Sequence, residues 1–463
     1  MNLRKKFIGD KAFYAMVFTI VVPMIVQNGI SSFVNLLDNI MVGQTGTEMI
    51  SGVSIGGQLI FIFNICVFGG ISGAGIFTAQ FFGKQDYEGV RATFRIKLYI
   101  VALLLAVFVT GFFIFGERLI GLFLNQEDVT GDAALTLQTG TAYLKIMLVG
   151  LIPFGLSQVY CSTLREGGET MLPMKASIAA VLVNLVFNYL LIFGNFGFPK
   201  WGVQGAAVAT VLSRFVELAV VLIGAHARVW KYPFLDKVYR SMRVSAGLLK
   251  QVLLKGMPLL VNEALWSVGM TMITQCYSTR GLAVIAALNI SNVISQLFNM
   301  VFMSMGSAIS ILVGQRLGAG EMEQARDLDN KIIAFGVMGS TATAVLLSLA
   351  APYIPLLYNT DESVRQMATQ LIWVAAIFLP VHNFCHSSYF TLRSGGKTML
   401  TFFFDCGFLW LASIPAAYFL SRFTNIPVIM LYTIVQLTDL LKAIGGFFCV
   451  KSDLWMHNIV KDT

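Results

Sequence analysis

Apolar stretches of about 20 residues or more recur along the whole chain, with short polar segments between them. A membrane helix needs about 20 apolar residues, whereas a membrane β-strand needs only about 10. Only helices and closed barrels can span lipid, because every backbone polar group must find its partner internally. The pattern therefore predicts an all-α integral membrane protein with twelve helices, at 13–37, 49–80, 92–115, 137–163, 170–194, 202–227, 247–279, 282–315, 328–350, 364–392, 398–420 and 425–450.

Composition supports the bilayer as solvent, since 56% of the 463 residues are hydrophobic and only 12% are charged. A soluble domain carries about 25% charged residues. The net charge of +8 does not indicate a nucleic-acid partner, because Lys and Arg stand between the apolar stretches rather than on one surface. The six cysteines occur singly and form no CxxC pair, which excludes the spacing of a disulfide framework or a zinc site.

The distribution of Lys and Arg predicts the orientation in the membrane. With the N-terminus inside, the cytoplasmic side receives most of the basic residues, as the positive-inside rule requires. We therefore expect a multi-pass protein of the inner (plasma) membrane with both termini in the cytoplasm and membrane lipid around it. The stretch from about 228 to 250 is the one long polar segment, and its part 236–250 is predicted to form an amphipathic helix on the membrane surface.

Two motifs recur in the second half of the chain in the same order as in the first. QFFGKQDYEGVR begins at Gln80 and QRLGAGEMEQAR at Gln315, while LREGGETMLP begins at Leu164 and LRSGGKTMLT at Leu392. All four copies fall on the predicted cytoplasmic side, so the halves are parallel six-helix repeats related by a pseudo-two-fold axis along the membrane normal. We predict an N-terminal lobe at 1–228, a cytoplasmic linker at 229–246 and a C-terminal lobe at 247–463. Transporters built from such repeats bind substrate between the halves and rock about that interface.

Polar side chains form stripes on several predicted helices, although a charge at the bilayer centre costs about 2.5–3.5 kcal/mol. These stripes indicate the walls of a water-accessible cavity, and hydrogen bonding between packed helices is the alternative. The predicted substrate-cavity residues are Asn28, Asn35, Asn64, Asn289, Asn292, Gln296, Asn299 and His386.

Two carboxylates within these stripes are candidate ion-coupling residues. A half-buried carboxylate is tolerated if it takes a proton or binds a cation among amide and hydroxyl oxygens. Asp38 with Asn184, Asn188 and Thr210 suits the first half, and Glu263 with His382 suits the second.

Other chemistries have less support in the chain. His382 and His386 have the four-residue spacing of a helical metal pair, but no third ligand and no HExxH motif accompany them. We therefore expect no metal site and no cofactor. The chain has no P-loop, so nothing in it supports ATP-driven transport.

The segment from Pro23 to NLLDNIMVGQTG, the paired Gln-x-x-Gly loops and the LREGGET and LRSGGKT turns together resemble the multidrug and toxic compound extrusion (MATE) family over nearly the full length. The resemblance implies a twelve-helix, two-lobed exporter of cationic, amphiphilic drugs or metabolites that exchanges them for sodium ions or protons. It also implies that Asp38 is the first-lobe cation-site aspartate, Asn184 its asparagine partner and Glu263 the second-lobe glutamate.

The chain departs from the family pattern at two positions. Family members commonly have Asp at the position of Asn188, and NorM-like members have Asp at the position of His382. Both departures weaken a sodium site, and a Glu263–His382 pair would favour protons over sodium.

Other functions have less support. A lipid-linked saccharide flippase should have extra helices and a cavity rich in Arg and Lys, and a membrane enzyme should show a nucleophile–base pair. A receptor would not need tandem halves. We expect a monomer that is not an enzyme and that binds a small organic substrate.

Overall fold

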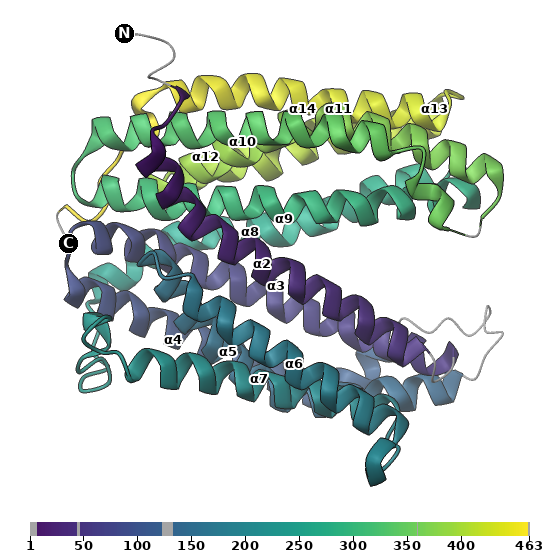
Figure 1. Ribbon diagram of the computed structural model, residues 1–463, viewed down its shortest axis with the longest axis horizontal. Helices are drawn as coiled ribbons and strands as arrows, with labels where there is room; N and C mark the ends of the chain where they lie inside the picture. The colour runs from purple at the N-terminus through teal and green to yellow at the C-terminus, as the bar shows by residue number, and fades with distance from the viewer. Residues whose placement is uncertain (1–6, 44–46, 123–132, 359, 462–463) are drawn as a thin grey trace. The chain divides into compact units, whose positions relative to one another are not determined.

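The computed structural model describes residues 7–43, 47–122, 133–358 and 360–461 (Figure 1). This described part is helical and contains no β-strand. Twelve long helical segments follow one another: α2 (Lys11–Gly43), α3 (Thr47–Gly83), α4 (Tyr87–Gly121), α5 (Ala133–Glu166), α6 (Met171–Phe193), α7 (Val203–His226), α8 (Ala246–Ser278), α9 (Leu282–Gly318), α10 (Met322–Ala350), α11 (Glu362–Ser394), a segment from α12 (Thr398–Phe402) to α13 (Ile414–Phe423), and α14 (Val428–Lys451).

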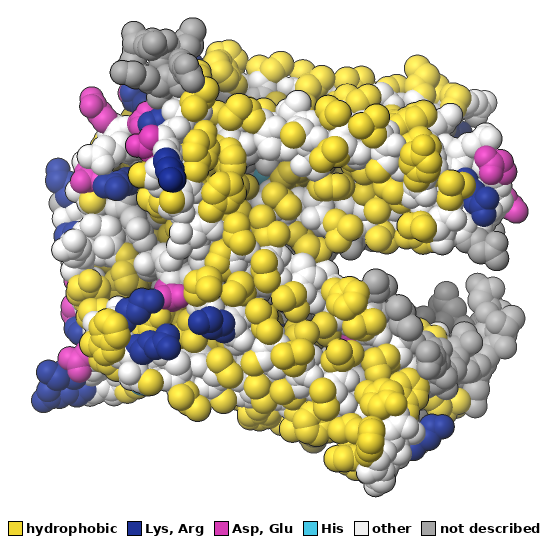
Figure 2. All heavy atoms as spheres, in the orientation of Figure 1, with side chains coloured by type: hydrophobic (Ala, Val, Ile, Leu, Met, Phe, Trp, Pro, Cys, Tyr) yellow, Lys and Arg dark blue, Asp and Glu magenta, His cyan; other side chains and the backbone are white. Residues whose placement is uncertain are grey.

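These segments match the twelve predicted ranges to within a few residues at most ends, so the predicted helices are confirmed. Among the described residues, eleven of the segments are long and apolar enough to cross a membrane, and α8 is the one outside that set. Hydrophobic side chains lie along the lengths of the helices, while many Lys and Arg side chains lie near helix ends (Figure 2). The chain is therefore a multi-pass membrane protein.

The chain divides into two compact units, each built mainly from one half of the chain. One unit contains 22–78 and 86–253, and the other contains 1–21, 79–85 and 254–463. One boundary between the units falls within α2, just before Pro23. Pro23 lies inside the helix and cannot donate a backbone hydrogen bond there. Another boundary falls within α3, after Thr78.

Each unit has its own packing. In the 22–253 unit, α7 packs against α5 and α6, and α4 packs against α5. In the other unit α11 is central and packs against α9, α10 and α14. The start of α2 belongs to this second unit, where the ring of Tyr14 lies edge-on to Phe335 of α10 at 5.2 Å.

The repeated LREGG and LRSGG motifs form the same turn at the ends of α5 and α11. The N–H of Glu169 donates to the carbonyl of Leu164 at 2.9 Å, and the N–H of Lys397 donates to the carbonyl of Leu392 at 3.2 Å. The second glycine of each motif has a left-handed backbone, with φ of 86° at Gly168 and 72° at Gly396. This is the pattern of a glycine-ended helix, and it explains why both halves keep the double glycine.

The two Gln-x-x-Gly motifs meet each other within the second unit. A Cβ atom on Gly83 would collide with the backbone carbonyl of Gln315, and a Cβ atom on Gly318 would collide with that of Gln80. The ends of α3 and α9 therefore cross with backbone against backbone, and each motif supplies the glycine that the other requires. The buried Gln80 side chain accepts a hydrogen bond from the N–H of Ile459 at 2.8 Å.

The linker before α8 differs from the prediction. The amphipathic helix predicted at 236–250 is wrong, because residues 236–245 form turns and irregular backbone and α8 begins only at Ala246. Lys237 has a positive φ of 55°, which an α-helix cannot accommodate. Side chains of α4 also donate hydrogen bonds to backbone carbonyls of this stretch, as described below.

Candidate functional site

A small polar cavity of about 70 Å³ lies in the 22–253 unit between α2, α6 and α7. Its apolar lining consists of Val34, Ala180 and Val181, and the rest of the lining is polar or charged. Those polar and charged residues are Ser31, Asp38, Ser177, Asn184, Thr210, Ser213, Arg214 and Glu217.

Four predicted coupling residues form one hydrogen-bonded chain beside this cavity. The Asn188 amide donates to the Asp38 carboxylate at 2.5 Å and to the Asn184 side-chain oxygen at 3.1 Å. Asn184 in turn donates to the Thr210 hydroxyl at 3.3 Å. Asn184 and Asn188 are one turn apart on α6, so both face α2 and α7 from the same side. The predicted grouping of Asp38, Asn184, Asn188 and Thr210 is thus present in the structure.

A second network reaches the cavity from α7. Glu217 is buried, pairs with Arg214 one turn earlier at 3.1 Å, and accepts a hydrogen bond from Ser177 at 3.2 Å. Gln27 donates to Ser177 at 2.7 Å and accepts from Arg165 at 3.0 Å. Arg165 belongs to the LREGG turn, so hydrogen bonds connect that turn to the cavity.

The cavity contains more acid than base. Asp38 and Glu217 contribute two carboxylates and Arg214 contributes one cation. Glu217 pairs with Arg214, whereas the Asp38 carboxylate accepts a hydrogen bond from the neutral amide of Asn188. Such a carboxylate can exchange a proton, or it can bind a cation together with neighbouring oxygens.

The second unit contains a separate polar cluster built from α8, α11, α14 and the segment 398–423. Asp405 lies in a π-helical turn, a geometry often found at functional sites. It pairs with Lys442 of α14 at 2.6 Å and accepts a hydrogen bond from Asn262 of α8 at 3.0 Å. Both charged side chains are largely buried, which requires the pairing that they show.

Glu263 and His382 lie in this unit but have different partners. The hydroxyl of Tyr389 donates to Glu263 at 3.3 Å. His382 lies 3.1 Å from the carboxylate of Asp439 on α14. The structure therefore does not form the Glu263–His382 pair that the sequence suggested. Glu263 meets α11 at Tyr389 instead, and His382 meets Asp439 of α14.

The predicted cavity residues are spread over both units. Asn28 and Asn64 are half-buried in α2 and α3, and His386 is half-buried in α11. The side chains of Asn289, Asn292 and Asn299 are exposed on α9. The side chains of Asn35 and Gln296 lie outside the described residues.

Five charged residues of these clusters were not singled out from the sequence: Arg214, Glu217, Asp405, Asp439 and Lys442. Their signal was present, because each is an ionisable residue inside an apolar helix. Arg214 and Glu217 also have the three-residue spacing that places both on one helical face. The partners of Asp405, Asp439 and Lys442, however, lie on other helices and could not be assigned from the sequence.

Comparison with known proteins relates these features to one family. The MatE family model matches residues 23–190 and 258–419. A probable multidrug resistance protein NorM from Halalkalibacterium halodurans is 27% identical over 409 residues, covering 87% of this chain and 86% of that protein. A probable multidrug resistance protein NorM from Thermotoga maritima is 23% identical over 411 residues, covering 87% and 84%.

Solved structures show the same fold. One described as the outward-facing conformation of a multidrug resistance MATE family transporter of the MOP superfamily has a TM-score of 0.85. It is 19% identical and covers 94% of each chain. At this identity the likeness shows the fold, and it confirms the predicted all-α architecture with two lobes.

Proposed function

The chain belongs to the MATE family of membrane transporters and is not an enzyme, and we propose that it is a secondary active multidrug or metabolite exporter. In this proposal it exchanges cationic, amphiphilic organic molecules for an ion by alternating access. The observation that carries the proposal is the hydrogen-bonded chain of Asp38, Asn188, Asn184 and Thr210 beside a polar cavity. The curated relatives are named multidrug resistance proteins, which supports the export of drug-like organic molecules.

We propose that the coupling ion is the proton rather than sodium, and that Asp38 carries it. Two features of the cavity support this choice. Asn188 places a neutral amide beside Asp38 rather than a second carboxylate, so that pair of residues offers a sodium ion one anionic ligand. Arg214 lines the same cavity, and its positive charge repels a metal cation more than it disfavours a neutral carboxylic acid.

The carboxylates also suit a positively charged substrate. Asp38 and Glu217 outnumber Arg214 in the cavity lining, so the formal charge of the ionised groups is negative. A flippase for lipid-linked saccharides would need the opposite balance to bind phosphate. We propose that substrate and proton compete for Asp38, so that loading one releases the other.

The bacterial relatives and the distribution of Lys and Arg support placement in the inner membrane with both termini in the cytoplasm. We propose that one chain is the working unit, because each polar cluster described above is complete within it.

Counterflow in proteoliposomes tests the function and the ion together. A labelled cationic dye is supplied outside, unlabelled dye is loaded inside, and pH and sodium gradients are imposed separately. We expect exchange of the dye, and we expect a pH gradient alone to drive its accumulation. Exchange driven only by sodium would contradict proton coupling, and absence of dye exchange under all gradients would contradict the substrate class.

A further inference from the structure

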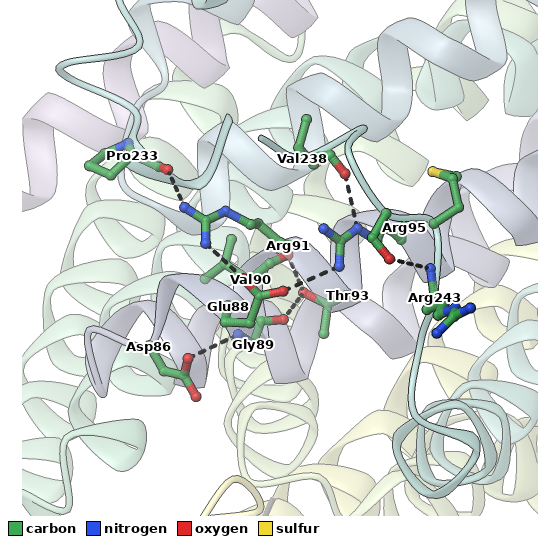
Figure 3. Close-up of polar contacts among 12 residues, drawn as sticks. Asp86, Glu88, Gly89, Val90, Arg91, Thr93, Arg95, Pro233, Val238 and Arg243 are labelled. Carbon is green, nitrogen blue, oxygen red and sulfur yellow. Dashed lines mark hydrogen bonds and ion pairs between the residues drawn. The ribbon is translucent and has the colours of Figure 1, made fainter. Parts of the chain in front are cut away.

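The linker between α7 and α8 runs along the side of α4 in a fixed path. Arg91 donates to the carbonyl of Pro233 at 3.1 Å, and Arg95 donates to that of Val238 at 3.0 Å (Figure 3). One turn further along the same helix, the hydroxyl of Tyr99 donates to the carbonyl of Met242 at 2.6 Å. Side chains four residues apart on a helix share a face, so these three donors form a ladder that holds the linker over two turns of α4.

Charge and ring contacts make this ladder rigid. Glu88 pairs with Arg91 at 2.7 Å and with Arg95 at 3.3 Å, which fixes both guanidinium groups (Figure 3). Phe234 of the linker is buried and packs against Phe94 with ring centres 6.1 Å apart. The linker therefore has a defined inner side that faces α4 and a defined outer side.

The outer side of the linker is basic. Lys237, Arg240 and Arg243 are all exposed. Lys237 lies 4.0 Å from the carboxylate of Asp236. Among the residues that the structure describes, no carboxylate pairs with Arg240 or Arg243. Three exposed positive charges thus fall between positions 237 and 243 of the linker.

The same stripe of α4 becomes apolar directly beyond the ladder. Leu103 and Val107 continue the four-residue spacing of Arg91, Arg95 and Tyr99, and their exposed fractions are 66% and 58%. Because α4 is a candidate membrane span with few buried residues, this surface faces lipid. A ligand that fits both parts has an anionic head group and long apolar chains.

We propose that the outer side of the linker and the adjoining stripe of α4 form a binding site for an anionic phospholipid. Lys237, Arg240 and Arg243 bind the phosphate head group, and the acyl chains lie along Leu103 and Val107. The ladder of Arg91, Arg95 and Tyr99 does not contact the lipid phosphate; it positions the three cations at the depth where the helix surface changes from polar to apolar. Basic residues that act only during membrane insertion would show no such lipid preference.

Native mass spectrometry of the purified full chain tests the site. The protein is titrated with dioleoylphosphatidylglycerol or with dioleoylphosphatidylcholine, and the fraction carrying lipid is measured. We expect the anionic lipid to bind at a concentration about tenfold lower than the zwitterionic lipid, since each basic residue near an anionic head group contributes on the order of a several-fold preference. Added salt should reduce this preference, because the charges are exposed.

Variants locate the site. Arg240→Gln combined with Arg243→Gln should remove most of the preference. Arg118→Gln combined with Lys200→Gln removes the same charge at exposed positions away from the linker and should leave the preference intact. Tyr99→Phe keeps every charge but breaks one rung of the ladder, and should weaken the preference several-fold.

Three results would overturn the proposal: equal binding of the two lipids by the wild type, an unchanged preference in the Arg240/Arg243 variant, or an equal loss in the Arg118/Lys200 control. An unchanged preference in Tyr99→Phe would overturn the positioning role of the ladder. Thermal melting of each purified variant establishes that it is folded before titration.

Discussion

The amide of Asn188 donates to the carboxylate of Asp38 at 2.5 Å across 150 positions of sequence. The hydrogen bond joins α6 to α2 beside the polar cavity, and it supports the negative charge of Asp38 when that residue has no proton. The ion-coupling proposal therefore rests on how this one carboxylate is surrounded.

We predict that Asp38→Asn abolishes ion-coupled export. The substitution keeps the shape and the hydrogen-bonding capacity of the side chain but removes its titratable charge. We expect at least about a tenfold loss of pH-driven dye accumulation in proteoliposomes, equivalent to about 1.4 kcal/mol or more. Thermal melting should remain close to that of the wild type, and full export by the variant would rule out Asp38 as the coupling residue.

Glu263→Gln should impair transport without abolishing it. Glu263 lies in a different unit and accepts its hydrogen bond from Tyr389 at 3.3 Å, a contact that glutamine can retain. We expect a several-fold reduction in initial rate, smaller than the effect of Asp38→Asn, in the same assay. A loss as complete as that of Asp38→Asn would mean that both units carry an essential carboxylate.

The ion pair between Lys97 and Glu166 should contribute strongly to stability because it is buried. Lys97 is completely buried and its Nζ atom lies 2.5 Å from the Glu166 carboxylate. Glu166→Gln leaves the lysine charge unbalanced, and removal of one partner from a buried pair costs about 3–5 kcal/mol. The measurement is the melting temperature in detergent.

Asp327→Asn provides the control for that prediction, because Asp327 pairs with Lys331 and is 49% exposed. Exposed pairs contribute about 0–1 kcal/mol. Equal shifts in the two variants would show that burial does not determine the strength of the Lys97–Glu166 pair.

The close crossing of α3 and α9 predicts that a glycine substitution there destabilises the protein, whereas one at an open position of α10 does not. Gly318→Ala would push a methyl group into the carbonyl of Gln80, and overpacking of this kind costs about 1–3 kcal/mol. Gly339→Ala in α10 places its methyl group where no atom lies within 4 Å, so it should stabilise the helix by about 0.5–1 kcal/mol. Melting temperatures that fall equally in both variants would contradict the proposed tight crossing.

The Glu169–Lys231 pair predicts a pH dependence of linker attachment. Burial opposes ionisation of Glu169, but hydrogen bonds from Lys231 and Tyr232 lower its pKa below 4.5 overall. A carboxylate whose pKa is lower in the folded protein than in the unfolded chain stabilises the fold at pH values above the unfolded-state pKa. That stability is lost as the pH falls through the folded-state pKa. The hydrogen bond to Glu169 also raises the pKa of Lys231 above 10.5, so its contribution is lost only as pH rises through that higher value.

Glu169→Gln should therefore lower the melting temperature at neutral pH. The loss of stability should be at most about 1 kcal/mol, because Lys231 is half-exposed. The difference should disappear as pH falls well below 4.5. A difference that persists in acid would show that the carboxylate charge is not its cause.

The sequence by itself determined the membrane helices, the duplication and the candidate acids. The length of an apolar stretch predicts a membrane-spanning helix whatever packs against that helix. The paired Gln-x-x-Gly and LR-x-GG motifs are read directly from the chain. Asp38, Asn184, Asn188 and Thr210 could be grouped because few polar residues are tolerated inside an apolar helix.

Only the tertiary structure decided which charges meet. Asp405 with Lys442 and His382 with Asp439 are contacts between helices, and helical periodicity states which face a residue occupies but not which helix lies opposite. The same limit explains the linker. Its composition favoured an amphipathic helix, but the side chains of Arg91, Arg95 and Tyr99 donate to its backbone carbonyls, and those contacts exist only once α4 is in place.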